Sequence, residues 1–252
     1  MIPKIIHYCW LSGDPYPEKI KRCLASWEKL KFEYQFVLWD WKKCQNEGIV
    51  NDWVHEAYEK KKYAFASDYI RLYAINKYGG IYLDTDVEII KSFNHLLNLP
   101  YFIGRESIGN RVEIAAFGAE KGCPWINLCL NYYNNRHFIK EDGSYDMRVM
   151  PDIIHEIMCK HYQYQYIPNI SSFKNKNNVF YQFPNDWFCA NTYKNKNENK
   201  PTYNITTNSI CIHHFANSWI QNSPLKKYIK MFLAKTKLFS LIKYFALHKY
   251  YD

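Results

Sequence analysis

The sequence lacks any apolar run long enough to cross a membrane. The apolar run in its opening stretch, Met1 to His7, is also too short for a secretory signal peptide. No internal repeat is visible. The eight cysteines are scattered and form no C-x-x-C pair, which argues against a structural zinc site. With no export signal, we expect these cysteines to be reduced and buried in a cytoplasmic protein.

Positive charge is concentrated at one end of the 252 residues. The net charge is +9, and positions 224–252 contribute seven lysines against one acidic residue, about two thirds of that excess. Such an excess points to anionic partners, namely nucleotide phosphates, nucleic acid or an acidic membrane surface. The length fits one large domain, with or without an appended segment.

The first half of the chain alternates predicted strands and helices. Strands are predicted at 2–10, 34–39 and 81–83, with a helix after Pro17 and a mainly helical stretch at 51–78 that ends at a glycine pair. Strand and helix in alternation predict an α/β fold with a largely parallel sheet.

The later elements are less strongly patterned. We predict strands at 101–104, 114–118 and 210–214, helices at 124–133, 151–160 and 224–250, and solvated loops at 174–178 and 194–200. The predicted division is a domain over 1–223 followed by a basic amphipathic helical segment over 224–252.

Two carboxylates follow the short apolar strand 81–83. Asp84 and Asp86 are one residue apart, so their side chains point to the same side at the carboxyl end of a strand, where α/β sheets bind ligands. Paired carboxylates there suit a hard cation such as Mn²⁺ or Mg²⁺, which leaves positions open for diphosphate oxygens. The alternative is an exposed acidic turn, because D-x-D alone is a weak pattern.

Other polar residues are candidates for the same site as Asp84 and Asp86. Asp68 and Arg71 share a helix face and could bind a sugar and a diphosphate, or form a plain i,i+3 ion pair on a helix surface. Late in the chain, His214 could complete a metal site while His213 faces the core. Trp10 ends the first strand at the same edge and could stack on a base, or belong to the core.

Taken together, these segments resemble the DXD-containing family of sugar transferases. The resemblance lies in Ile2 to Trp10, Ser67 to Tyr73, Tyr78 to Asp86, and His213 to Trp219. The family includes bacterial capsular and surface polysaccharide transferases, yeast outer-chain mannosyltransferases and the glucosylating domains of large clostridial toxins. Roughly the first half of the chain follows its pattern.

The resemblance implies a GT-A fold, which is a single nucleotide-sugar-binding domain with a mostly parallel sheet flanked by helices. It also implies a donor that is commonly UDP-linked, Mn²⁺ or Mg²⁺, and retention of anomeric configuration. The residues it assigns to the donor are Trp10, Cys9, Asp68, Arg71, Asp84, Thr85, Ser218 and Trp219. Those it assigns to catalysis are Asp84, Asp86, Asp68 and Arg71, and to the metal Asp84, Asp86 and His214.

We therefore expect a metal-dependent retaining glycosyltransferase of capsular or surface polysaccharide synthesis. Its donor would be a UDP-linked galactose, N-acetylgalactosamine or glucose, and its acceptor a saccharide carried on a lipid such as undecaprenyl diphosphate. Retention could proceed by double displacement or by front-face attack, and we favour the front-face route because no carboxylate stands out as a nucleophile. An aspartyl-nucleophile phosphohydrolase and a basic nucleic-acid-binding protein are the alternatives, although we expect no nucleic-acid partner.

The lysine-rich segment 224–252 has two interpretations. Basic residues interleaved with bulky apolar ones are typical of helices that lie on anionic bilayers, which would make the protein peripheral on the inner face of the cytoplasmic membrane. The same pattern also fits an ordinary amphipathic helix packed on the domain.

Overall fold

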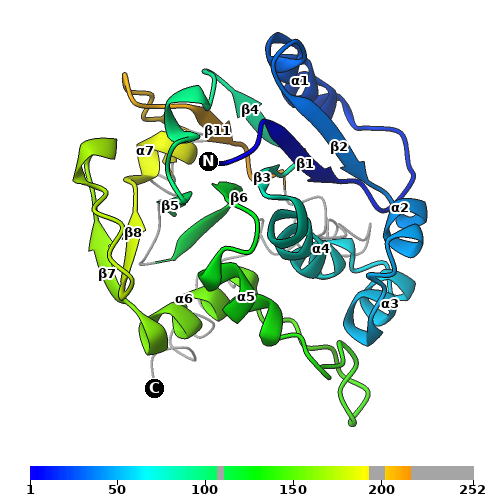
Figure 1. Ribbon diagram of the computed structural model, residues 1–252. Coiled ribbons are helices and arrows are strands. Elements are labelled where there is room, and N and C mark those ends of the chain that lie inside the picture. Colours follow the sequence, from blue (N-terminus) through cyan, green and yellow to red (C-terminus); the bar gives the residue numbers. More distant parts are fainter. Residues whose placement is uncertain (107–110, 193–201, 217–252) are drawn as a thin grey trace, which may run out of the picture. The chain divides into compact units, whose positions relative to one another are not determined.

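A central sheet of five strands organises the part of the chain that this computed structural model describes, residues 1–106, 111–192 and 202–216. Its strands are, in spatial order, β2 (Gln35–Trp39), β1 (Ile5–Cys9), β3 (Gly80–Leu83), β6 (Val112–Ala119) and β5 (Tyr101–Arg105) (Figure 1). β1 pairs in parallel with β2 and β3, whereas β6 runs antiparallel to β3 and β5. Four of the five strands therefore run in one direction, which confirms the predicted α/β fold with a mostly parallel sheet.

Each helix predicted within the described residues is present, one predicted stretch is divided in two, and the two short helices Trp41–Asn46 and Asn185–Phe188 were not predicted. They are α1 (Glu18–Trp27), α2 (Trp41–Asn46), α3 (Asp52–Glu59), α4 (Tyr63–Tyr78), α5 (Pro124–Asn131), α6 (Met150–His161) and α7 (Asn185–Phe188). The stretch 51–78 breaks near Lys61, whose φ of 55° is left-handed. α4 packs against β1, β3 and β6 between α3 and α5. None of the helices in the described ranges has both the length and the apolar character that a membrane crossing requires.

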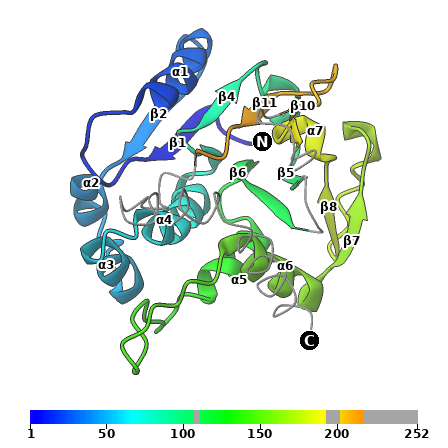
Figure 2. The same ribbon diagram turned by 180° about the vertical axis from the view of Figure 1, so that it is seen from behind.

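Three short ladders complete the described structure. They are β4 (Val87–Ile89) with β11 (Cys211–His213), β7 (Gln163–Tyr166) with β8 (Val179–Gln182), and β9 (Asn191–Thr192) with β10 (Thr202–Tyr203). β4 continues directly from the turn after β3, and β11 runs antiparallel beside it, as both views show (Figure 2). This pairing brings a segment from late in the chain to the end of β3. The predicted segment 224–252 lies outside the described residues.

Two glycines join α4 to β3 where no other residue fits. Gly79 has a φ of 67° and Gly80 a φ of 111°, a region that side chains with a Cβ rarely adopt. A Cβ on Gly80 would also lie 2.6 Å from the carbonyl oxygen of Ile5 on β1. The glycine pair therefore permits the close approach of β3 to β1, on which the position of the turn after β3 depends.

A buried histidine ties these same elements together. His7 on β1 accepts a hydrogen bond at Nδ1 from Trp39 Nε1 at 3.1 Å, and its Nε2 lies 3.0 Å from the carbonyl oxygen of Gly79. The neutral tautomer with the proton on Nε2 satisfies both contacts. Burial lowers the pKa of His7 to about 4. His7 is therefore an uncharged structural group in the core.

Candidate active site

Asp84 and Asp86 lie in the tight turn between β3 and β4. The turn is closed by a bond from the Val87 amide to the Asp84 carbonyl oxygen at 3.0 Å, and the Asp84 amide donates to the Ala115 carbonyl oxygen of β6 at 2.8 Å. Both carboxylates have one oxygen in a cluster with an imidazole nitrogen of His213, and these ligand atoms lie within 4.8 Å of one another. The structure thus brings the predicted pair of carboxylates together with a third group of ligand chemistry.

Arg71 of α4 links two of the predicted carboxylates. Its Nη2 lies 3.2 Å from Asp84 Oδ1 and 3.4 Å from Asp68 Oδ1. Nη1 donates to the Ile114 carbonyl oxygen at 3.1 Å, and Nε donates to the Ser67 carbonyl oxygen at 3.3 Å. All three guanidinium nitrogens therefore have protein partners.

This ion pair is buried, unlike the surface pair that i,i+3 spacing alone would suggest. Arg71 is 4% exposed and Asp68 is 7% exposed. The guanidinium lies 4.6 Å from the centre of the Tyr82 ring, a cation–π contact. Burial opposes the charge of Arg71, but Asp84, Tyr82 and Asp68 raise its pKa above the usual value. Arg71 therefore pairs with both Asp84 and Asp68, and its predicted contact with a donor stays a prediction.

The histidine assignment made from the sequence needs correction. β11 pairs with β4 so that His213 stands opposite Val87, and His213 Nε2 lies 3.6 Å from Asp86 Oδ1. The His214 ring instead contacts Glu88 through Nε2 at 2.8 Å and the Tyr203 hydroxyl through Nδ1 at 3.3 Å. His213, and not His214, is therefore the imidazole beside the carboxylates.

Asp86 is also fixed by the backbone that follows β11. Its carbonyl oxygen accepts from the His214 amide at 3.1 Å, and its Oδ2 accepts from the Ala216 amide at 2.7 Å. Between these two residues, Phe215 has a left-handed φ of 44° and places its ring centre 3.9 Å from that of His213. The segment after β11 therefore wraps around Asp86 and leaves its Oδ1 facing His213.

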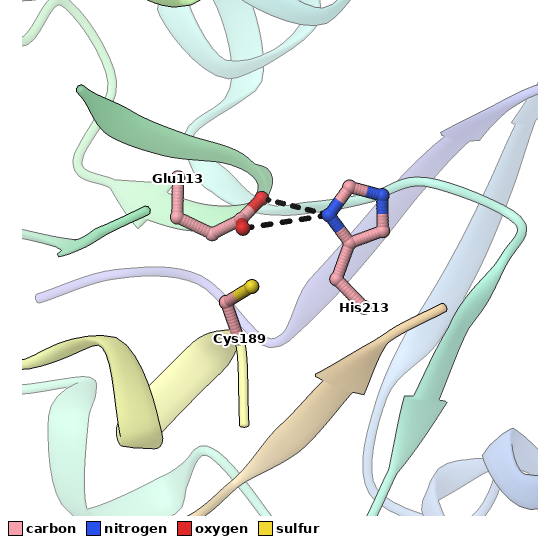
Figure 3. Close-up of side chains that lie close together, drawn as sticks. All are labelled: Glu113, Cys189 and His213. Atoms are coloured by element: carbon pink, nitrogen blue, oxygen red, sulfur yellow. Dashed lines mark hydrogen bonds and ion pairs between the residues drawn. The ribbon is translucent and has the colours of Figure 1, made fainter. Parts of the chain in front are cut away.

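Glu113 on β6 holds the other side of the same imidazole (Figure 3). Its Oε1 and Oε2 lie 3.2 and 3.4 Å from His213 Nδ1, and Oε1 accepts from the Ala115 amide at 2.8 Å. Burial opposes both charges, yet the pairing lowers the pKa of Glu113 and raises that of His213 to about 9. Sequence analysis missed Glu113, although an acid between two apolar residues of a buried strand is a signal that it needs a partner.

The other residues predicted to bind the donor, where the structure describes them, are not part of the cluster around Asp86 and His213. Trp10 follows β1, donates from Nε1 to the Asp14 carbonyl oxygen at 2.7 Å, and has its ring centre 4.7 Å from that of Tyr16. Cys9 ends β1 near Tyr82, and burial raises the pKa of its thiol. Thr85 lies half-buried in the turn between the two aspartates. Ser218 and Trp219 lie outside the described residues.

The residues around Asp86 fit a divalent cation. Two carboxylate oxygens and one imidazole nitrogen, which would give up its proton when the ion binds, form a donor set that Mn²⁺ accepts, with positions left for other oxygen ligands. Asp84 is shared with Arg71, whereas Asp86 Oδ1 faces His213 Nε2 at 3.6 Å. The donor chemistry therefore agrees with the predicted Mn²⁺ or Mg²⁺ site, with His213 in place of His214.

Comparison with known families points to sugar transfer. Residues 17–103 match the sequence model of a family described as a glycosyltransferase sugar-binding region containing a DXD motif. The matched region includes α4 and the Asp84-Thr85-Asp86 turn. Glycosyl transfer is therefore the class of activity that the sequence similarity supports.

Individual relatives carry related descriptions. The chain is 35% identical over 131 residues to inositol phosphoceramide mannosyltransferase 3 of Schizosaccharomyces pombe. The aligned region covers 50% of this chain and 35% of that protein. The chain is 29% identical over 114 residues to an uncharacterized glycosyltransferase of Acanthamoeba polyphaga mimivirus, covering 44% of this chain and 45% of the relative. A mannosyl phosphorylinositol ceramide synthase of Saccharomyces cerevisiae is 31% identical over 110 residues, covering 42% of this chain and 28% of the relative. The chain thus spans less than half the length of each of these relatives.

Among solved structures, the chain is similar to the PaToxG glycosyltransferase. The TM-score is 0.46 and the sequence identity 20%, with 63% of this chain and 69% of that chain covered.

Proposed function

We propose that this chain is a metal-dependent glycosyltransferase of the GT-A type that retains anomeric configuration. It moves a hexose or N-acetylhexosamine from a nucleotide-sugar to a saccharide acceptor carried on a lipid. The observation that carries the proposal is the convergence of Asp84, Asp86 and His213 at the end of β3. A divalent cation bound there supplies a Lewis acid for the leaving nucleoside diphosphate.

The protein's own groups divide the remaining work. Asp86 and His213 hold the cation, and Arg71 keeps Asp84 aimed at it through the contact at 3.2 Å. Asp68 accepts hydrogen bonds from the donor sugar at the far side of the guanidinium. Front-face attack is the favoured route to retention, since the leaving phosphate then assists in deprotonating the acceptor.

The donor sugar is the least defined part of the proposal. UDP-linked galactose, N-acetylgalactosamine and glucose are candidates by resemblance. Two relatives are named for mannosyl groups, so nucleotide-linked mannose joins the set to be tested. Their names also refer to ceramide lipids, which supports a lipid-borne acceptor, and we propose by resemblance that this acceptor is an intermediate of surface polysaccharide.

The test is release of nucleoside diphosphate from a panel of UDP-sugars and GDP-mannose, with and without Mn²⁺. We expect slow, Mn²⁺-dependent hydrolysis of one donor and at least a ~100-fold loss in Asp86→Asn, because a metal ligand is removed. Asp142→Asn makes the same chemical change at an exposed position and should behave as the wild type.

The outcome that contradicts the proposal is also defined. If no donor is hydrolysed and calorimetry detects no binding of UDP or GDP with Mn²⁺, the chain is not a transferase of this type. Phosphate release from simple phosphate esters would then favour the aspartyl phosphohydrolase. Salt-dependent binding of RNA or DNA would favour a nucleic-acid-binding protein.

The proposed location of the protein in the cell depends only on the positive charge of residues 224–252. We propose that the lysines of 224–252 hold the protein on the cytoplasmic face of a membrane by electrostatic attraction to anionic lipid. The full chain should then float with vesicles containing phosphatidylserine and not with phosphatidylcholine vesicles, and high salt should release it. Equal flotation with both vesicle types would contradict this part.

A further inference from the structure

Glu113 is a buried carboxylate that the proposed chemistry does not use directly. It lies on β6 with 1% of its surface exposed, where an unpaired charge would be costly. Its partners are the Ala115 amide at 2.8 Å, the thiol of Cys189 and the Nδ1 atom of His213. Three separate segments thus meet at one carboxylate (Figure 3).

The contact with His213 involves both carboxylate oxygens. Oε1 lies 3.2 Å and Oε2 lies 3.4 Å from the same Nδ1 atom. An imidazole has two ring nitrogens, and a proton held on Nδ1 by an acceptor leaves the lone pair on Nε2. That Nε2 atom is the one that lies 3.6 Å from Asp86 Oδ1.

We propose that Glu113 is a positioning residue that orients the His213 ring so that Nε2 serves as a ligand for a divalent cation beside Asp84 and Asp86. Glu113 does not touch the cation or the donor. It acts by fixing the tautomer and the ring angle, and by making the imidazole a stronger donor, as carboxylates behind metal-bound histidines do. This inference rests on the proposed function, because it assumes that the cation binds at Asp86.

The imidazole of His213 also packs against a neighbouring aromatic ring. The Phe215 ring lies 3.9 Å away at an angle of 32°, and β11 fixes the backbone of His213 against Val87. These contacts limit rotation of the imidazole without choosing which nitrogen is protonated. Of the contacts described for Nδ1, the one with Glu113 is what selects the tautomer.

Cys189 provides a matched control within the same cluster. It follows α7, and its thiol bonds to Glu113. A cation held instead by Glu113, Cys189 and Nδ1 of His213 would use a second group of ligand atoms that also lie within 4.8 Å of one another. Cys189→Ala removes that second site and leaves the Glu113–His213 contact in place.

The experiment is a titration of the full chain with Mn²⁺, followed by the electron paramagnetic resonance signal of the free ion. We expect Glu113→Gln to weaken Mn²⁺ binding about 10- to 100-fold. Cys189→Ala should change the affinity by less than about 3-fold. Melting curves without metal show whether each variant is folded.

The outcomes separate this inference from the proposed function. If the wild type binds Mn²⁺, Asp86→Asn does not, and Glu113→Gln binds as tightly as the wild type, the role of Glu113 is overturned and the metal site stands. If Cys189→Ala loses the ion as Glu113→Gln does, the cation uses the second cluster and the inference is wrong. If the wild type does not bind Mn²⁺ with or without UDP, both are overturned.

A second measurement needs no substitution at Glu113. In the ¹⁵N-histidine-labelled wild type saturated with Mg²⁺, we expect His213 as the neutral ring with its proton on Nδ1. A proton on Nε2 would overturn the inference, since that nitrogen could not then be a ligand.

Discussion

The two aspartates of the Asp84-Thr85-Asp86 turn are held by different kinds of partner. Asp84 faces the guanidinium of Arg71, a permanent cation that is itself buried. Asp86 faces the His213 imidazole and accepts a backbone amide on its other oxygen. The first aspartate therefore has a counter-charge that cannot lose its proton, whereas the partner of the second is an imidazole that can. The two positions of this D-x-D turn are therefore chemically unequal, and the second is better suited to bind a metal ion together with its partner.

Removing the fixed cation should have the largest effect. Arg71→Met leaves Asp68 and Asp84 without the counter-charge that they share, and we expect a loss of about 4 kcal/mol in the free energy of unfolding. Denaturant titration at pH 7 measures it. Arg71→Lys, which keeps the charge and loses the fork of donors, should fall between Arg71→Met and the wild type.

Arg22→Met is the matched control for that change. Arg22 lies 3.8 Å from Glu18 on α1 and its side chain is 80% exposed, so the loss should stay below about 1 kcal/mol. If the two Met variants are equally stable, the buried network does not hold Asp84 in the way described.

The imidazole of His7 sharpens the comparison, because the hydrogen bonds described for it are with Gly79 and Trp39 and not with a carboxylate. The pKa of His7 is lowered by burial to about 4, so the folded state favours its neutral form. Its stabilisation is fully present above the unfolded pKa of about 6.5, and falls by up to about 3 kcal/mol as the pH drops from there to about 4.

The measurement for His7 is the free energy of unfolding across pH 7 to 4 for the wild type and for His7→Gln. Other groups titrate in both proteins alike, so the difference between the two curves isolates His7. The advantage of the wild type should shrink as the pH falls. Parallel curves would show that His7 carries a charge in the folded state or is not needed as a neutral group.

The smallest of the three effects concerns the two adjacent histidines. His213→Gln should weaken Mn²⁺ binding by about 10-fold or more, because a ligand beside Asp86 is lost. His214→Gln removes a contact with Glu88, whose side chain is 45% exposed, and should leave Mn²⁺ binding within about 3-fold. The reverse ranking would restore the assignment made from the sequence.

Local sequence pattern was enough to predict the position of Asp84 and Asp86 and the elements around them. β1, β2, α4 and β3 follow from apolar spacing, the glycine pair and the prolines before α1, and their alternation sets the direction of the strands. The edge on which Asp84 and Asp86 lie then follows from the rule for ligand sites in α/β sheets.

The histidines could not be assigned from local pattern alone. Strand alternation predicts that neighbouring residues of 211–214 face opposite ways, but it does not say which face meets the carboxylates. That choice is made by pairing with β4, a strand of three residues that was not predicted. The burial of Arg71 and the partnership of Glu113 likewise depend on contacts between distant segments, on which i,i+3 spacing carries no information.

The backbone amide that Ala216 donates to Asp86 has a kinetic consequence. The two residues are 130 positions apart in the sequence, so this contact closes one of the longest loops in the described chain. Long loops are entropically costly to close, and contacts of this kind tend to form late. We therefore expect the sheet to assemble before Asp86 gains its imidazole partner. In stopped-flow refolding, the recovery of Mn²⁺ binding should lag behind the recovery of tryptophan fluorescence. The ability to bind Mn²⁺ would then mark the last step of folding.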